Sequence, residues 1–149
     1  MSIAVRQAAL SDADIIAPLF DQYRQFYRQE SHLALARAFI VERLARHESV
    51  IFLAENTSHE AVGFTQLFPS FTSVGVGRIW VLNDLYVVPA ARRHGVGSIL
   101  LETARAHAAA TGCKRIELST AHDNPARKLY ESHGYTTDDG FIHYSLPLG

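Results

Sequence analysis

The chain has 149 residues, of which 48% are hydrophobic, and its 14 Lys and Arg against 15 Asp and Glu give a net charge of −1. This balanced charge offers no basic field for nucleic acid or a membrane surface, so we expect neither partner. The apolar content suits a single domain, residues 1–149, with a buried core. The single cysteine, Cys113, excludes an internal disulfide, and the N-terminus lacks a signal-peptide pattern, so we expect a cytoplasmic protein.

The first half of the chain predicts three strands and two helices. Residues 3–7 alternate like a short strand, and Ser11 with Asp14 resembles a helix cap before an amphipathic helix. A second helix is expected over residues 32–46. Two further strands are expected at 49–55 and 60–68, joined by a turn at 56–59, and a mobile connection follows at 70–77.

The second half alternates between strands and helices. The expected elements are a strand at 78–88 stopped by Pro89, a helix at 98–111 ended by Gly112, a strand at 115–120, a helix at 124–133 closed by Gly134, and a last strand at 141–146. This order indicates an α/β (α+β) fold with a sheet of mixed direction.

The stretch ARRHGVGS, residues 91–98, lies between an expected strand and an expected helix. Free backbone N–H groups and the positive end of the helix dipole make such a helix start an anion site. Gly95 and Gly97 let a phosphate approach the backbone closely, although a solvated turn with strain-relieving glycines is the alternative. The stretch is not a P-loop, because no lysine follows its glycines. It is also not a dinucleotide-binding fingerprint, because Leu100 stands where the third Gly or Ala is required.

Two motifs resemble the GNAT superfamily of acetyl-CoA-dependent N-acetyltransferases. Arg92, Gly95 and Gly97 match its Q/R-x-x-G-x-G/A signature, and ARKLYESHGY, residues 126–135, is similar to its A-x-x-L-Y-x-x-x-G-[FY] segment. The resemblance covers roughly residues 79–135 and is closest to the polyamine, diamine and small-histone-type branch. It implies a GNAT-like mixed, mostly antiparallel sheet with a splayed central strand pair, flanked by about four helices.

The resemblance also implies acetyl-CoA as the cofactor. Its pyrophosphate would meet the backbone at the helix start, and its pantetheine arm would pair with the end of the central strand. The residues expected to bind it are Leu85, Tyr86, Val87, Arg92, Arg93, His94, Gly95, Val96, Gly97, Ser98, Asn124 and Lys128. The family often has Asn where Asp123 stands. Asn124 precedes Pro125 and is equally well explained as a helix N-cap, so its cofactor role stays open.

Catalysis by direct attack of an amine requires a proton donor and a base. By resemblance, Tyr130 is the general acid for the departing thiolate, the alternative being a buried aromatic of a short helix. Asn83 and Asp84 interrupt an apolar strand and suit a β-bulge, where they are either bonded or functional. Asp84 is the first candidate for the general base. The resemblance implies that a backbone N–H near Leu85 donates a hydrogen bond to the developing oxyanion.

The substrate is expected to be a small cationic amine, such as a polyamine. The residues expected to line its pocket are Tyr23, Tyr27, Glu30, Asp84, Asp138 and Asp139, which are equally well explained as ordinary surface residues. Alternative substrates are a protein N-terminus or peptide, an amino acid or an aminoglycoside, and a noncatalytic acetyl-CoA sensor is the alternative of another class. The eight histidines show no metal-ligand spacing, so no metal is expected. We also expect a homodimer.

Overall fold

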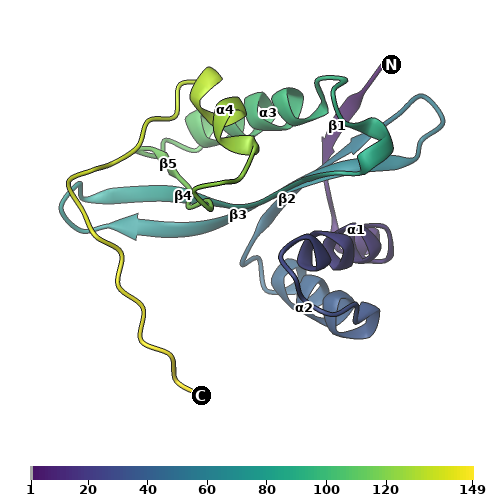
Figure 1. Cartoon of the computed structure of the whole chain (residues 1–149), viewed down its shortest axis with the longest axis horizontal. Helices are drawn as coiled ribbons and strands as arrows, with labels where there is room; N and C mark the ends of the chain where they lie inside the picture. Colours follow the sequence, from purple (N-terminus) through teal and green to yellow (C-terminus); the bar gives the residue numbers. More distant parts are fainter. Residues whose placement is uncertain (1) are drawn as a thin grey trace.

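The computed structural model describes residues 2–149 as a central sheet between two pairs of helices (Figure 1). The strands are β1 (Ala4–Gln7), β2 (Val50–Glu55), β3 (Ala61–Thr72), β4 (Gly77–Val87) and β5 (Ile116–Glu117); the α-helices are α1 (Ala13–Phe26), α2 (Leu33–Ala45), α3 (Val96–Ala110) and α4 (Ala126–Ser132); the 3-10 helices are η1 (Leu10–Asp12) and η2 (Pro89–Ala91). The strand order is β1-β2-β3-β4-β5, antiparallel except for the β4–β5 pair. The expected mixed, mostly antiparallel α/β fold is confirmed.

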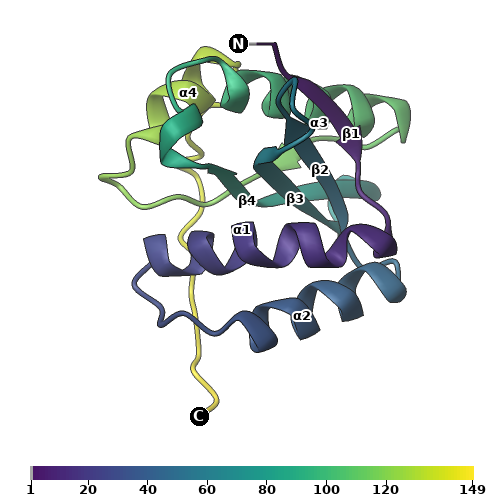
Figure 2. The same ribbon diagram turned by 90° about the vertical axis from the view of Figure 1, so that its right-hand side faces the viewer.

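Helices α1 and α2 cover one face of the sheet (Figure 2). Ile16 and Phe20 of α1 are buried with Ile40 of α2 in a core cluster that also contains sheet residues. The expected cap at Ser11 is wrong, because the Ala9 N–H donates instead to the Asp12 carboxylate at 2.7 Å, at the start of η1. The side-chain acceptor at the start of this helical region is therefore Asp12, one residue after the expected Ser11.

Strands β3 and β4 form a long hairpin whose turn covers only residues 73–76. Their pairing runs from Gly63 opposite Val87 to Thr72 opposite Gly77, so the mobile connection expected at 70–77 is wrong. Ser and Gly favour loops by propensity, but antiparallel backbone pairing with the neighbouring strand outweighs that weak preference.

Helices α3 and α4 cover the opposite face of the sheet. Leu100, Leu101 and Ala104 of α3 are at most 1% exposed and pack with Phe52 and Leu67 in a second core cluster. Helix α3 begins at Val96, two residues before the expected start at 98, because the buried Val96 side chain already belongs to this cluster. The core thus reaches directly to the glycine loop.

The chain after α3 departs most from expectation. The strand expected over 115–120 is only two residues long. The strand expected at 141–146 is wrong, since residues 141–149 are in no helix or strand and project away from the body (Figures 1 and 2). Alternation in the sequence shows that a segment can pair, but it does not supply a partner strand. Among the described residues, no helix is long and apolar enough to span a membrane.

Candidate active site

The centre of the sheet contains a β-bulge in β4. Gln66 of β3 lies opposite Asp84, but the next residue, Leu67, lies opposite Leu82, so Asn83 has no partner on β3. Asn83 is exposed, whereas Asp84 is only 2% exposed. The bulge predicted from this polar pair is confirmed, and it turns the two side chains into different environments.

Asp84 is held in the interior by polar partners from β3. The Gln66 side-chain amide donates to its carboxylate at 2.6 Å, and the Thr65 hydroxyl donates to its backbone carbonyl at 2.8 Å. Burial raises the pKa of Asp84 to about 7, although the Gln66 hydrogen bond opposes the shift. A carboxyl group with a pKa near neutrality can both take up and release a proton under physiological conditions.

The β4–β5 strand pair opens just before the bulge. Pairing is limited to Trp80 with Ile116 and Val81 with Glu117, so β5 does not accompany the second half of β4. This arrangement is the splayed strand pair that was expected. The stretch 85–87 consequently has a neighbour in β3 but none in β5, which leaves an edge suited to a peptide-like ligand.

Tyr23 of α1 reaches the bulge, and Tyr27, directly after α1, lies beside it. The Tyr23 hydroxyl donates to the Asn83 carbonyl at 2.9 Å, and the Tyr23 and Tyr27 rings are 5.1 Å apart. The Asn124 amide donates to the Tyr27 hydroxyl at 3.2 Å, while its oxygen accepts from the Ala126 N–H at 2.9 Å. Asn124 thus caps α4 and connects it to α1, with both of its side-chain polar atoms engaged.

Tyr130 of α4 belongs to the same group of side chains. It is 9% exposed, and its ring lies 5.9 Å from that of Tyr135. Burial raises the pKa of Tyr130 to about 12, so its phenol stays protonated at neutral pH. Burial also raises the pKa of Tyr23, with smaller contributions from Asp84, Tyr27 and Tyr130.

The glycine loop before α3 contains two residues in the left-handed region, Arg93 at φ 66° and Gly95 at φ 79°. A Cβ on Gly95 would meet nothing within 4 Å, so glycine is favoured there by backbone conformation. At Gly97 a Cβ would lie 2.8 Å from a Leu129 methyl group. Glycine at position 97 therefore lets α3 pack closely on α4, and the close approach of a phosphate there stays a prediction.

The first turn of α3 also presents backbone N–H groups and one side chain. The N–H groups of Val96, Gly97 and Ser98 have no intrahelical acceptor, because the first helical hydrogen bond is donated by Ile99 to the Gly95 carbonyl. The Ser98 hydroxyl lies 3.0 Å from Nε2 of His133. Such free N–H groups at the positive end of a helix dipole are suited to an anion, and the anion site stays a prediction.

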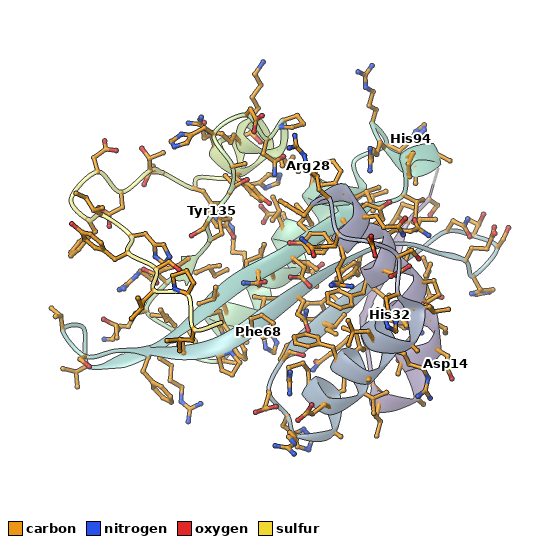
Figure 3. All side chains as sticks on the ribbon, turned by 60° about the horizontal axis from the view of Figure 1, so that its bottom comes forward. Asp14, Arg28, His32, Phe68, His94 and Tyr135 are labelled. Carbon is orange, nitrogen blue, oxygen red and sulfur yellow. The ribbon has the colours of Figure 1, made fainter. Side chains whose placement is uncertain are left out.

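Arg92 faces the strand. Its Nε donates to the Val87 carbonyl at 2.8 Å, and its guanidinium carbon lies 5.6 Å from the centre of the Tyr86 ring. Arg92 therefore braces the end of β4 and retains its terminal nitrogens for a ligand. His94 lies in the exposed loop, on the same side of the molecule as Arg28 after α1 (Figure 3).

Several expected site residues lie on the surface and form no hydrogen bond or ion pair with this cluster in the described part of the chain. They are Arg93, His94, Lys128, Glu30 and Asp139, all exposed. Asp138 is also exposed, and its carboxylate accepts from the Gly140 N–H at 3.0 Å. Tyr23 and Tyr27 lie together, whereas Glu30, Asp138 and Asp139 are exposed, and the amine pocket stays a prediction.

Two residues of this region were not predicted from the sequence. Gln66 was detectable as a polar residue inside an apolar strand, opposite the bulge that was expected. His133 lies within the quoted segment 126–135, but its contact with Ser98 joins residues 35 positions apart, and no local pattern indicates it.

Two surface hollows lie away from this cluster. One of about 300 Å³ is lined by Pro69, Arg78, Ile79, Trp80, Thr111 and Cys113, and one of about 370 Å³ lies around β1 and the β2–β3 turn. Neither contains a buried titratable group, whereas the β4 bulge does. The bulge is therefore the better candidate for the reaction centre. In the part of the chain described, no group of three or more His, Cys, Asp or Glu side chains is arranged to hold a metal ion.

Known proteins are similar to this chain in both sequence and fold. Residues 15–135 match the acetyltransferase (GNAT) family. The chain is 54% identical over 143 residues, 95% of each chain, to the uncharacterized N-acetyltransferase YhfO of Bacillus subtilis. It is 25% identical over 146 residues, 95% of this chain and 94% of the other, to an aminoglycoside N(6')-acetyltransferase type 1 of Acinetobacter haemolyticus. A crystal structure of a probable acetyltransferase superposes with a TM-score of 0.92, at 43% identity and 98% coverage of both chains.

The chain therefore belongs to the GNAT family of acetyltransferases, whose reaction is the acetyl-CoA-dependent transfer of an acetyl group. It is an N-acetyltransferase by that membership.

Proposed function

We propose that this N-acetyltransferase acetylates a primary amine of a small polycationic molecule, with Asp84 as general base and Tyr130 as general acid. The observation that supports it most is the convergence of a buried carboxyl group, a protonated phenol and the splayed strand edge. Asp84 lies at the β4 bulge, and both Asp84 and Tyr130 lie near enough to Tyr23 to contribute to its raised pKa. Acid and base are thus provided by separate elements, β4 and α4, close to the splayed strand edge.

The residues present fit acetyl-CoA. The amides of Val96, Gly97 and Ser98 and the terminal nitrogens of Arg92 would hold the pyrophosphate, and the edge at 85–87 would hold the pantetheine arm. Bound there, acetyl-CoA supplies an acetyl group activated as a thioester. Lys128 and Arg93 are exposed cations available to its phosphates.

Asp84 would accept the proton that the substrate ammonium must lose before it can attack, either directly or through a water molecule. A pKa of about 7 suits this step at neutral pH. A backbone N–H near Leu85 would donate to the carbonyl oxygen as charge develops on it. Tyr130 would then donate its proton to the departing thiolate, since its raised pKa keeps it protonated beforehand.

A polyamine and an aminoglycoside share the chemistry expected of the substrate, which is several ammonium groups on a flexible or polyhydroxylated body. The aromatic faces of Tyr23 and Tyr27 at the bulge suit a cation. A relative of this chain is an aminoglycoside N(6')-acetyltransferase, which supports the same class of amine. The polyamine and diamine branch remains part of the proposal. A protein or peptide amine is the alternative substrate. We also propose that the enzyme acts in the cytoplasm.

Thiol release from acetyl-CoA, measured against polyamines, aminoglycosides, amino acids and N-terminal peptides, tests this function. We expect the highest kcat/KM with a polyamine or an aminoglycoside, and a mass gain of one acetyl group on the amine. Tight binding of acetyl-CoA without thiol release from any amine would support the noncatalytic sensor instead. Turnover confined to peptides would overturn the substrate class but not the reaction.

A further inference from the structure

Three side chains form a continuous line of hydrogen bonds across the contact between α3 and α4. Nδ1 of His133 lies 2.7 Å from the Glu102 carboxylate, and Nε2 of the same ring lies 3.0 Å from the Ser98 hydroxyl. His133 follows α4 directly, and its side chain is 15% exposed. Ser98 lies in the first turn of α3, whose free N–H groups are proposed to hold the pyrophosphate. A titratable ring thus contacts the proposed phosphate site through one hydroxyl group.

Glu102 determines which nitrogen of the neutral His133 ring carries the hydrogen. The hydrogen bond with His133 lowers the pKa of Glu102, and the charge of Arg105 adds to this effect, so Glu102 is an ionised acceptor at neutral pH. Nδ1 must therefore be the donor to Glu102. In a neutral imidazole the other nitrogen is an acceptor only. The Ser98 hydroxyl therefore has to donate its hydrogen to Nε2 whenever His133 is uncharged.

The Ser98 hydroxyl has one hydrogen to donate, and the charge of His133 decides where it goes. When His133 is neutral, this hydrogen is directed to Nε2, and the Ser98 oxygen presents only lone pairs to a phosphate oxygen. When His133 is protonated, Nε2 becomes a donor to Ser98, and the hydroxyl hydrogen is free to be donated to phosphate. The imidazolium also adds a positive charge near the anion. Phosphate binding and protonation of His133 therefore favour each other.

The other titratable groups around His133 come from α3, from the residue after Gly134 and from the glycine loop. Arg105 donates to the His133 backbone carbonyl and pairs with Glu102 at 3.5 Å. Burial raises the pKa of Tyr135, so its phenol stays uncharged at neutral pH. His94 is exposed and forms no hydrogen bond or ion pair with His133 within residues 2–149. Histidine is the side chain that ordinarily changes charge between about pH 5 and 8, so the His133 ring is suited to respond to pH in this group.

We propose that binding of acetyl-CoA transfers one proton from the solvent to His133, and that the Ser98 hydroxyl donates to the pyrophosphate only when this ring is charged. His133 is thus a positioning residue whose protonation sets the affinity for the cofactor. The inference rests on the acetyl-CoA site proposed above. Cofactor binding then favours low pH, whereas Asp84 must be ionised to accept a proton. At low acetyl-CoA concentration the rate should therefore pass through a maximum near neutral pH.

Isothermal titration calorimetry with dephospho-CoA tests this proton linkage. Dephospho-CoA keeps the pyrophosphate but lacks the 3′-phosphate, whose own protonation at about pH 6 would otherwise add to the signal. The wild-type Kd should rise at least about fivefold between about pH 6 and about pH 8. Titrations in buffers of different ionisation enthalpy should show proton uptake at neutral pH. His133→Gln has an amide that can donate to Ser98 at every pH, so its Kd should be nearly independent of pH and its proton uptake should be absent.

The matched control is His47→Gln, on an exposed turn after α2, which should behave like the wild type. Circular dichroism should show both variants folded. Binding of dephospho-CoA without proton uptake, or an uptake that survives in His133→Gln, would overturn this inference and leave the cofactor site in place. If neither acetyl-CoA nor dephospho-CoA binds at either pH, the proposed cofactor site is wrong and the inference falls with it.

NMR of the Cε1 atom in protein with isotope-labelled histidine reads the charge of the ring directly. The His133 signal is identified by its absence from His133→Gln. At about pH 7, saturating dephospho-CoA should move this signal toward its position at low pH. Ser98→Ala should reduce the movement, because the hydroxyl that links the ring to the phosphate is lost. A His133 signal that stays at its neutral position in the complex would contradict the proton uptake.

Discussion

The Nε2 atom of His133 lies 3.0 Å from the Ser98 hydroxyl, which joins the end of α4 to the first turn of α3. Glu102 holds the other ring nitrogen of His133 at 2.7 Å, and Arg105 donates to the His133 carbonyl. The helix that carries Tyr130 is thus fixed against the amides proposed to hold pyrophosphate. His133 and Glu102 are positioning residues in this arrangement.

Loss of the His133 side chain should loosen this connection. We expect His133→Ala to raise the Kd of acetyl-CoA about fivefold, the effect of losing one hydrogen bond worth about 1 kcal/mol. Isothermal titration calorimetry measures it, and His47→Ala, on an exposed turn after α2, is the matched control. An unchanged Kd in a folded His133→Ala protein would show that the Ser98 contact does not organise the binding loop.

Substitutions at Gly97 distinguish two reasons for a glycine at this position, close packing of α3 on α4 and close approach of a phosphate. Gly97→Val should lower kcat by displacing α4, because even a Cβ there lies 2.8 Å from a Leu129 methyl group. If packing is the cause, adding Leu129→Ala should restore much of the activity of Gly97→Val, as measured by thiol release. If the double variant stays as inactive as Gly97→Val, and Leu129→Ala alone is active, then phosphate approach requires this glycine.

The stability of the protein should depend on Asp84 in a defined direction. Its folded pKa of about 7 lies above its ordinary value of 3.8, so between these pH values the folded state keeps a proton that the unfolded state loses. Folding is therefore favoured at low pH, and this contribution, up to about 4 kcal/mol, is lost as pH rises to about 7. Urea unfolding should show Asp84→Asn gaining stability relative to wild type across this window. A difference independent of pH would contradict the raised pKa.

Activity should also depend on the ionisation of Asp84, but it should rise with pH where stability falls. Because only ionised Asp84 can accept a proton, kcat/KM should rise with pH through about 7. Gln66 stabilises the carboxylate by its 2.6 Å hydrogen bond, so Gln66→Leu should move this rise to higher pH, while Asp84→Asn should remove it. A pH profile unaltered by Gln66→Leu would exclude Asp84 as the titrating base.

The sequence allowed the fold class and the bulge to be predicted because both have local signals. Polar Asn83 and Asp84 interrupt an apolar strand, and the order of elements along the chain restricts the sheet topology. The loop expected at 70–77 failed because strand pairing overrides propensity. The strand expected at 141–146 failed for a different reason. Alternation of apolar and polar residues shows that a segment can form a strand, but it does not supply a neighbouring strand to pair with.

The site residues divide in the same way. The glycine loop and Tyr130 were found by motif, but the roles of Gly97 and Asn124 depend on contacts distant in sequence. Asn124 binds Tyr27 across 97 positions, and Gly97 packs on Leu129 across the α3–α4 interface. Gln66 acts through a partner 18 residues away on the adjacent strand. Such relationships arise only when separate elements are brought together.

Tyr130 and Tyr135 provide a matched pair for testing the proposed general acid. Their rings lie 5.9 Å apart, and the Tyr135 hydroxyl is buried without a hydrogen-bond partner among residues 2–149. Removing that hydroxyl should cost little, because no hydrogen bond is lost. With a pKa of about 12, the Tyr130 phenol should stay protonated throughout an ordinary assay range, so no loss of rate from its ionisation is expected.

The decisive measurement is the single-turnover rate of acetyl transfer by Tyr130→Phe beside Tyr135→Phe, with enzyme in excess over acetyl-CoA. Tyr130→Phe should keep its fold and acetyl-CoA affinity but lose about 10² to 10⁴ in rate, the usual contribution of a general acid. Tyr135→Phe should remain close to wild type. A Tyr130→Phe enzyme as fast as Tyr135→Phe would contradict proton donation by Tyr130, and the thiolate would then take its proton from water or from the substrate ammonium.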